Sequence, residues 1–179
     1  MGTAYYVPSL AQYYFAALAH CYVPVLSADE FPLLAQVAPG ALTLAVSQSG
    51  ETYDTLKALR YARTQGSATA AIVNAPGSSM TREVDQVVLQ GAGPEICVLS
   101  TKSTISQVTI FLRLALELAR QRGLLDTARY REHVQALSAL PETLRQMYSA
   151  LVPTMSRISQ MYSQIPNWLF IGRGIYSAV

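Results

Sequence analysis

The feature that most constrains the fold is a short apolar run that passes directly into a hydroxyl-rich turn. Residues 42–46 are Leu-Thr-Leu-Ala-Val, and the turn Ser-Gln-Ser-Gly-Glu-Thr follows at residues 47–52. A strand with almost no alternation of apolar and polar residues is typical of a parallel sheet, in which both faces are covered. Residues 69–73 and 86–89 are further apolar runs, so we predict three strands of such a sheet.

Helical patterns alternate with these strands. Residues 52–65 form one that Gly66 ends, and residues 103–122 form a longer one that ends at Gly123. Because alternating strands and helices build βαβ units, the predicted class is α/β with a parallel sheet.

Weaker patterns predict the remaining elements. We expect helices at residues 8–20 and 127–162, with new helical segments beginning at Pro141 and Pro153. A single helical turn is predicted at residues 79–84, and short strands at residues 23–26 and 168–171. The stretches 2–6 and 172–176 share a Gly-x-small-x-Tyr-like pattern, which suggests that a strand is missing before Gly2. Our hypothesis is that residues 168–171 fill its place, within the chain or by exchange with another copy.

The turn at residues 47–52 is the strongest candidate site. Ligands bind beyond the carboxyl ends of parallel strands, and a helix N-terminus there presents free N–H groups to an anion. Ser47, Ser49 and Thr52 add three hydroxyl groups, and Gly50 permits close approach of the backbone. The alternative is that Ser49 or Thr52 only caps the helix. For the whole cluster, we favour phosphate binding. The turn has no lysine and differs from the nucleotide P-loop pattern.

A second polar segment precedes the long helix at residues 95–102. Ser100 and Thr101 could cap that helix or bond sugar hydroxyls, and Thr3 could offer a third hydroxyl contact. Glu51 is expected to point away from a phosphate or to serve a neighbouring chain. No paired carboxylates or His–carboxylate constellation is evident, so we predict no catalytic residue within this chain.

Composition excludes several classes of protein. The net charge is only +2 and the Lys and Arg residues are dispersed, which argues against nucleic-acid binding. No apolar stretch is long enough for a membrane span. Cys21 and Cys97 lie far apart, and we interpret both as small core residues in a reducing cytoplasm. With only two histidines and no cluster at ligand spacing, we expect no metal and no cofactor.

Four motifs together resemble a known family. They are Ser47-Gln-Ser-Gly-Glu-Thr52, Asn74-Ala-Pro-Gly-Ser-Ser79, Gly93-Pro-Glu-Ile96 with Ser100-Thr-Lys102, and Leu169-Phe-Ile-Gly-Arg-Gly174. The first resembles the sugar isomerase (SIS) domain signature, and all four resemble the isomerase half of glutamine–fructose-6-phosphate aminotransferases. Amino-sugar-phosphate deaminases of the same family remain an alternative, as does a non-catalytic sugar-phosphate sensor.

The resemblance implies a flavodoxin-like SIS fold, a parallel sheet with helices on both faces. It also implies that Ser47, Gln48, Ser49 and Thr52 hold the phosphate, and that Thr3, Val98 and Ser100 line the sugar of a hexose phosphate. The ligand would be fructose 6-phosphate or glucosamine 6-phosphate. The apolar surface expected of half a two-domain unit predicts dimers or aggregation, and we expect a homodimer.

The chain departs from the family pattern in two ways. Cys97 replaces a usual Gly and Leu99 a usual Ala, which could strain the turn or crowd the sugar, and Ala4 replaces a usual Ser. The resemblance also predicts how the chain divides into domains, and that two of these domains are incomplete. Residues 1–123 would be a first SIS domain that lacks its first strand, 124–166 a helical connector, and 167–179 the start of a second SIS domain. The catalytic Glu, His and Lys of the isomerase would then lie beyond Val179.

Overall fold

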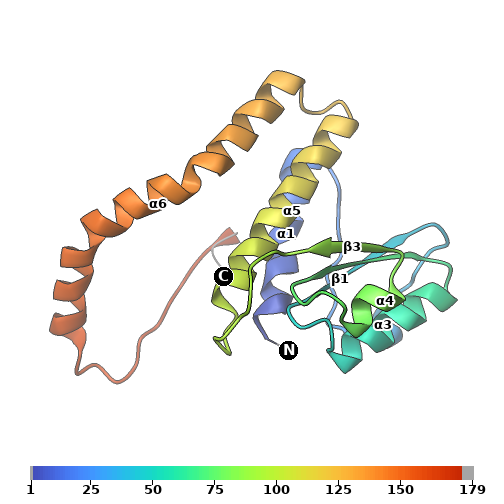
Figure 1. Ribbon diagram of the computed structural model, residues 1–179, viewed down its shortest axis with the longest axis horizontal. Helices are drawn as coiled ribbons and strands as arrows, with labels where there is room; N and C mark the ends of the chain where they lie inside the picture. The colour runs from blue at the N-terminus through green and yellow to red at the C-terminus, as the bar shows by residue number, and fades with distance from the viewer. Residues whose placement is uncertain (1, 175–179) are drawn as a thin grey trace.

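The computed structural model describes residues 2–174 of the chain and contains a three-stranded parallel sheet in the order β1-β2-β3 (Figure 1). In parallel register, Leu42 of β1 pairs with Ala68 of β2, and Ala70 of β2 pairs with Gln86 of β3. The elements in chain order are η1 (Thr3–Tyr5), α1 (Tyr6–Ala19), α2 (Phe31–Leu34), β1 (Leu42–Ser47), α3 (Tyr53–Thr64), β2 (Ala68–Val73), α4 (Ser79–Glu83), β3 (Gln86–Leu89), α5 (Thr101–Gln121) and α6 (Thr127–Tyr162). The predicted α/β class and all three strands are confirmed.

Helices cover both faces of the sheet. On one face, Phe15 of α1 and Phe111 of α5 pack with Ile72 of β2. On the other, Leu59 of α3 packs with Ala71 and Val73 of β2. Neighbouring residues of β2 thus face opposite layers, as the period of two along a strand requires. β2 is buried over five of its six residues, which explains why its sequence shows no polar alternation.

The two other predicted strands are wrong. Residues 23–26 form no strand, although Val23 packs against the same core as Leu44 and Val46 of β1. Residues 168–171 also form no strand and are exposed. A strand requires a partner for its N–H and C=O groups, and an apolar composition does not provide one. The expectation that a first strand is missing from the sheet stays a prediction.

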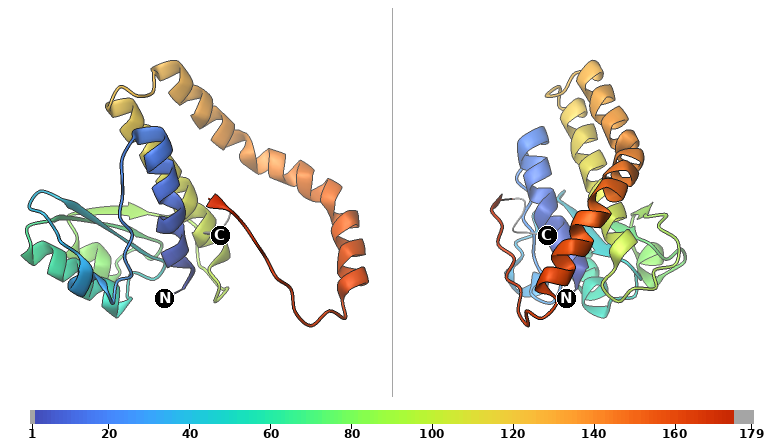
Figure 2. Two further views of the ribbon diagram at one scale, coloured as in Figure 1. Left: turned by 180° about the vertical axis from the view of Figure 1, so that it is seen from behind. Right: turned by 90° about the vertical axis from the view of Figure 1, so that its left-hand side faces the viewer.

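α6 is one continuous helix, so the predicted breaks at Pro141 and Pro153 are wrong. The side chain of Asp126 caps its start by accepting from the N–H of Arg129 at 2.8 Å. Figures 1 and 2 show α6 leaving the sheet domain as a bent arm, with the following chain returning as an extended tail. A proline inside a helix removes one hydrogen bond and bends the helix, which an exposed arm tolerates. The division at residues 123 and 166 stays a prediction.

Two further findings concern composition. Cys97 is exposed and Cys21 is half-buried, so the expectation that both are core residues is wrong for Cys97. Among the residues the structure describes, no helix is long and apolar enough to cross a membrane.

Asp85 joins the starts of β2 and β3, and it should make the free energy of unfolding depend on pH. Its carboxylate accepts from the N–H and the hydroxyl of Thr69, both at 2.8 Å, and these bonds lower the pKa of Asp85 below its usual 3.8. A depressed pKa stabilises the fold above pH 3.8, and this contribution is lost as the pH falls through the folded pKa. We expect Asp85→Asn to be less stable than the parent at pH 7, with the difference shrinking by pH 3. Urea denaturation at both pH values measures the free energy of unfolding of the variant and the parent. The same difference between them at pH 7 and pH 3 would contradict the prediction.

Candidate functional site

The turn after β1 gathers the predicted phosphate residues. Ser47 ends β1 and is buried, and its Oγ lies 3.2 Å from Thr52 Oγ1 and accepts from the N–H of Gly50 at 3.0 Å. Ser49 Oγ accepts from the N–H of Glu51 at 3.2 Å. Gln48 and Ser49 are half-buried and Thr52 is exposed. The structure therefore brings Ser47, Ser49 and Thr52 into one turn at the N-terminus of α3.

The hydrogen bonds of this turn show whether the side chain of Thr52 caps α3. Thr52 occupies the N-cap position of α3, yet its side chain caps no N–H of the helix. Its hydroxyl pairs instead with Ser47. The first N–H groups of α3 thus have no side-chain cap from Thr52, and such groups at a helix N-terminus suit an anion.

Gly50 holds the turn against a neighbouring loop. Its φ is +68°, in the left-handed region that glycine adopts without strain. A Cβ at this position would lie 2.1 Å from Ser78 Oγ and 2.7 Å from Ser78 Cβ. The N–H of Met80 also donates to the carbonyl of Gly50 at 3.1 Å. The turn is therefore packed directly on the loop that precedes α4.

Glu51 points to this same loop. Its Oε1 accepts from the N–H of Ser79 at 2.8 Å. Hydrogen bonds from the side chain and backbone of Ser79 lower the pKa of Glu51, with Arg82 adding a smaller effect. The carboxylate is thus engaged on α4, which leaves the N-terminus of α3 to another anion.

The second predicted segment forms a separate turn beside η1. The hydroxyl of Thr3 donates to the carbonyl of Leu99 at 2.7 Å, and Ser100 N–H donates to the carbonyl of Cys97 at 3.0 Å. Val98 lies at the tip of this turn and is 99% exposed. η1 in turn contacts β1. Thr3 of η1 is thereby brought next to the turn that carries Val98 and Ser100 and leads into α5.

The departure at Cys97 does not strain this turn. Among the described residues other than glycine, only His20 and Ser100 have positive φ, and Ser100 has +57°. Cys97 therefore needs no glycine conformation, and the expected strain is wrong. Glu95 supports the turn because its carboxylate accepts from Ser103 N–H at 3.0 Å and from Cys97 N–H at 3.3 Å. The Ser103 N–H is the main cause of the lowered pKa of Glu95.

Two residues to which the sequence assigned no role of their own, Gln90 and Asn74, tie these loops together. Gln90 is buried after β3, and its Nε2 donates to the carbonyl of Ser47 at 3.1 Å. The Asn74 side chain follows β2, donates to the carbonyl of Gly93 at 2.7 Å and accepts from the N–H of Ala92 at 3.0 Å. Their place at the ends of strands was the only available signal, since their partners lie far along the chain.

The site offers hydrogen-bond donors and contains no evident acid–base pair. Its polar groups are serine and threonine hydroxyls, backbone N–H groups and one glutamine, which suit binding of a phosphate. No group of at least three His, Cys, Asp or Glu residues in the described part of the chain is placed to hold a metal ion. The arrangement supports recognition of an anion next to a polar turn.

Known proteins provide an independent comparison. Residues 1–117 match the sequence pattern described as the SIS domain. The chain is 39% identical over 174 residues to a protein of Brucella abortus biovar 1 called glutamine–fructose-6-phosphate aminotransferase [isomerizing], and 38% identical over 179 residues to its Caulobacter vibrioides namesake. These matches cover 97% and 99% of this chain but 28% and 29% of the relatives. The chain thus spans less than a third of their length.

A solved structure supports the same relationship. The C-terminal domain of glucosamine-fructose-6-phosphate aminotransferase from Francisella tularensis matches with a TM-score of 0.89 and 30% identity, covering 99% of this chain and 51% of that chain. The resemblance and the fold class predicted from the sequence are both confirmed by these findings.

Proposed function

This chain belongs to the SIS domain family, and from that premise we propose that it binds a hexose phosphate at residues 47–52. The observation that carries the proposal is the clustering of Ser47, Ser49 and Thr52 at the N-terminus of α3. Hydroxyl and N–H donors at a helix N-terminus bind phosphate, and the helix dipole adds a favourable field. Gln48 joins the site because it lies between two of these hydroxyl residues.

We propose that the turn at residues 97–100 receives the sugar. Thr3 and Ser100 present polar groups there, and exposed Val98 offers an apolar contact. Sugar pockets combine such contacts, with polar groups setting the orientation. Leu99 is also exposed, so its larger side chain is expected to narrow the space beside the sugar relative to the alanine usual in the family.

Fructose 6-phosphate and glucosamine 6-phosphate are the ligands we propose, in the cytoplasm and in amino-sugar biosynthesis. The relatives at 38–39% identity are named as aminotransferases that act on fructose 6-phosphate, which favours this assignment over an amino-sugar-phosphate deaminase. Serine and threonine hydroxyls do not titrate near neutral pH, so the role proposed for this chain is binding.

Isothermal titration of both hexose phosphates into this chain tests the proposal. We expect binding, and we expect Ser49→Ala to weaken it at least about tenfold because a hydrogen bond to a charged group contributes roughly 1.5–3 kcal/mol. Ser47→Ala/Ser49→Ala should weaken it about a hundredfold or more. Ser156→Ala/Ser159→Ala, on exposed positions of α6, is the matched control and should bind as the parent does.

Circular dichroism shows whether a variant that fails to bind is still folded. Since Ser47 is buried, its loss could unfold the turn. Half-buried Ser49 makes one hydrogen bond within the turn, from the N–H of Glu51, so its loss disturbs the turn less. A folded parent that binds neither sugar phosphate, or a Ser49→Ala variant with unchanged affinity, would refute the site.

A further inference from the structure

The outer edge of β1 has no strand beside it in the described structure. β1 pairs only with β2, and no backbone hydrogen bond joins it to residues 22–26. The carbonyl of Ala41 accepts from Ala68 N–H, so the odd-numbered residues at this end direct their backbone groups toward β2. The N–H and C=O groups of Leu42, Leu44 and Val46 therefore point to the open edge. An edge of this kind is a template for an added strand.

The tail carries a segment suited to that edge. Trp168 to Ile171 is an uninterrupted apolar run, and Leu169, Phe170 and Ile171 are 94%, 89% and 97% exposed. Apolar side chains without alternation are typical of a strand covered on both faces. The open edge of β1 lies between two helical layers, which is the environment such a strand requires.

The arm that carries the tail is exposed along most of its length, although near its end the Tyr162 ring meets the Trp168 ring with centroids 5.9 Å apart. α6 is anchored at its start, where the Tyr130 ring lies 5.7 Å from the Arg113 guanidinium and 5.5 Å from that of Arg120. Beyond this anchor the arm has no buried residue. Holding so much apolar surface in water is unfavourable, so a partner is expected.

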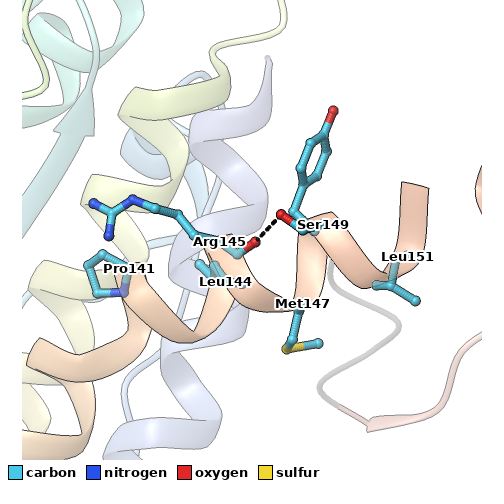
Figure 3. A pocket seen from close by; sticks show the side chains of 7 residues that line it. Pro141, Leu144, Arg145, Met147, Ser149 and Leu151 are labelled. Carbon is cyan, nitrogen blue, oxygen red and sulfur yellow. Dashed lines mark hydrogen bonds between the residues drawn. The ribbon is translucent and has the colours of Figure 1, made fainter. Parts of the chain in front are cut away.

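The sequence of the arm indicates that the partner is helical. Apolar residues recur along α6 at alternating spacings of four and three, a heptad pattern that pairs one helix with another. We call this set the seam, and it consists of Leu144, Tyr148, Leu151, Met155, Ile158 and Tyr162. Leu144 and Leu151 lie about two helical turns apart, and Figure 3 shows them on the stretch of α6 where they and Met147 line one pocket.

We propose that two copies of this chain exchange their arms. The tail residues 168–171 of each copy add to the open edge of β1 in the other, and the two seams pack together. One chain displays both the donor strand and the acceptor edge, so a symmetric pair satisfies both at once, and closed twofold symmetry prevents further growth. β-Strand addition supplies the backbone hydrogen bonds that the edge leaves unmade.

Sedimentation velocity on the intact chain tests the pair. A dimer is expected, and Phe170→Asp or Leu151→Asp should each raise its dissociation constant at least about tenfold. Two controls should leave it unchanged: Leu33→Asp, on an exposed apolar residue of α2, and Gln146→Asp, on α6 outside the seam. A monomer at every concentration, or a dissociation constant that Phe170→Asp leaves unchanged, overturns the proposal.

Cross-linking separates exchange from closure within one chain. In a Cys21→Ser/Cys97→Ser background, Leu42→Cys and Phe170→Cys chains are mixed and treated with a short bismaleimide. Exchange predicts a covalent heterodimer, whereas Leu33→Cys mixed with Phe170→Cys should give none. A chain carrying both Leu42→Cys and Phe170→Cys that cross-links only within itself would refute exchange, even if a dimer forms by the seams.

Discussion

Gly50→Ala is expected to lower the free energy of unfolding by about 2–5 kcal/mol, the sum of a left-handed backbone cost and an overpacking cost. The new Cβ would lie 2.1 Å from Ser78 Oγ. Because Ser78 is buried, its side chain cannot relieve this contact by rotating into solvent. For a chain of this size, the melting temperature should fall by roughly 5–15 °C. Thermal denaturation measures the change.

Gly77→Ala is the matched control. Gly77 has φ +73°, close to that of Gly50, but a Cβ there meets nothing within 4 Å. Its substitution should carry the backbone cost alone, about 1–2 kcal/mol. Adding Ser78→Gly to Gly50→Ala should recover part of the loss by removing the clash. Equal effects of the two alanine substitutions would show that Gly50 and Ser78 are not in contact.

Gly50→Ala should also affect binding of the sugar phosphate. Gly50 N–H donates to Ser47 Oγ, so a displaced Gly50 moves a proposed phosphate residue. We therefore expect Gly50→Ala to weaken sugar-phosphate binding even at temperatures at which the variant is still folded. Gly77→Ala should not have this effect.

Elements whose signals lie within one segment could be predicted from the sequence. β1 follows the Pro39-Gly40 turn, and α3 ends just before Gly66, which has φ +80°. Strands that depend on a distant partner could not. Residues 23–26 have the composition of a strand, but pairing depends on what lies beside them. α6 showed the reverse error, since a proline lowers helix stability without always ending the helix.

The candidate site divides in the same way. The hydroxyls of Ser47, Ser49 and Thr52 were predictable because strand, turn and helix follow each other directly. Gln90 and Ser78 were not, because their contacts to Ser47 and Gly50 join segments that are separated along the chain. A single sequence contains no signal for such pairs.

Phe111→Ala is expected to cost about 3–5 kcal/mol, the usual effect of removing a buried aromatic ring. Phe111 is 4% exposed and meets Phe15 of α1 edge to face, with ring centroids 6.5 Å apart. The ring thus joins α1 to α5 above Ile72 of β2. Ile105→Ala, on the exposed side of α5, is the control and should change stability by less than about 0.5 kcal/mol.

Loosening α1 from α5 should also affect the proposed sugar turn. η1 leads into α1 and Ser100 precedes α5, so the Thr3–Leu99 bond spans the two helices that Phe111 holds together. We expect Phe111→Ala to weaken binding of the hexose phosphates more than binding of inorganic phosphate, which contacts only residues 47–52 in our proposal. Calorimetry with both ligands measures the difference. Equal losses would show that the turn at residues 97–100 does not contact the sugar.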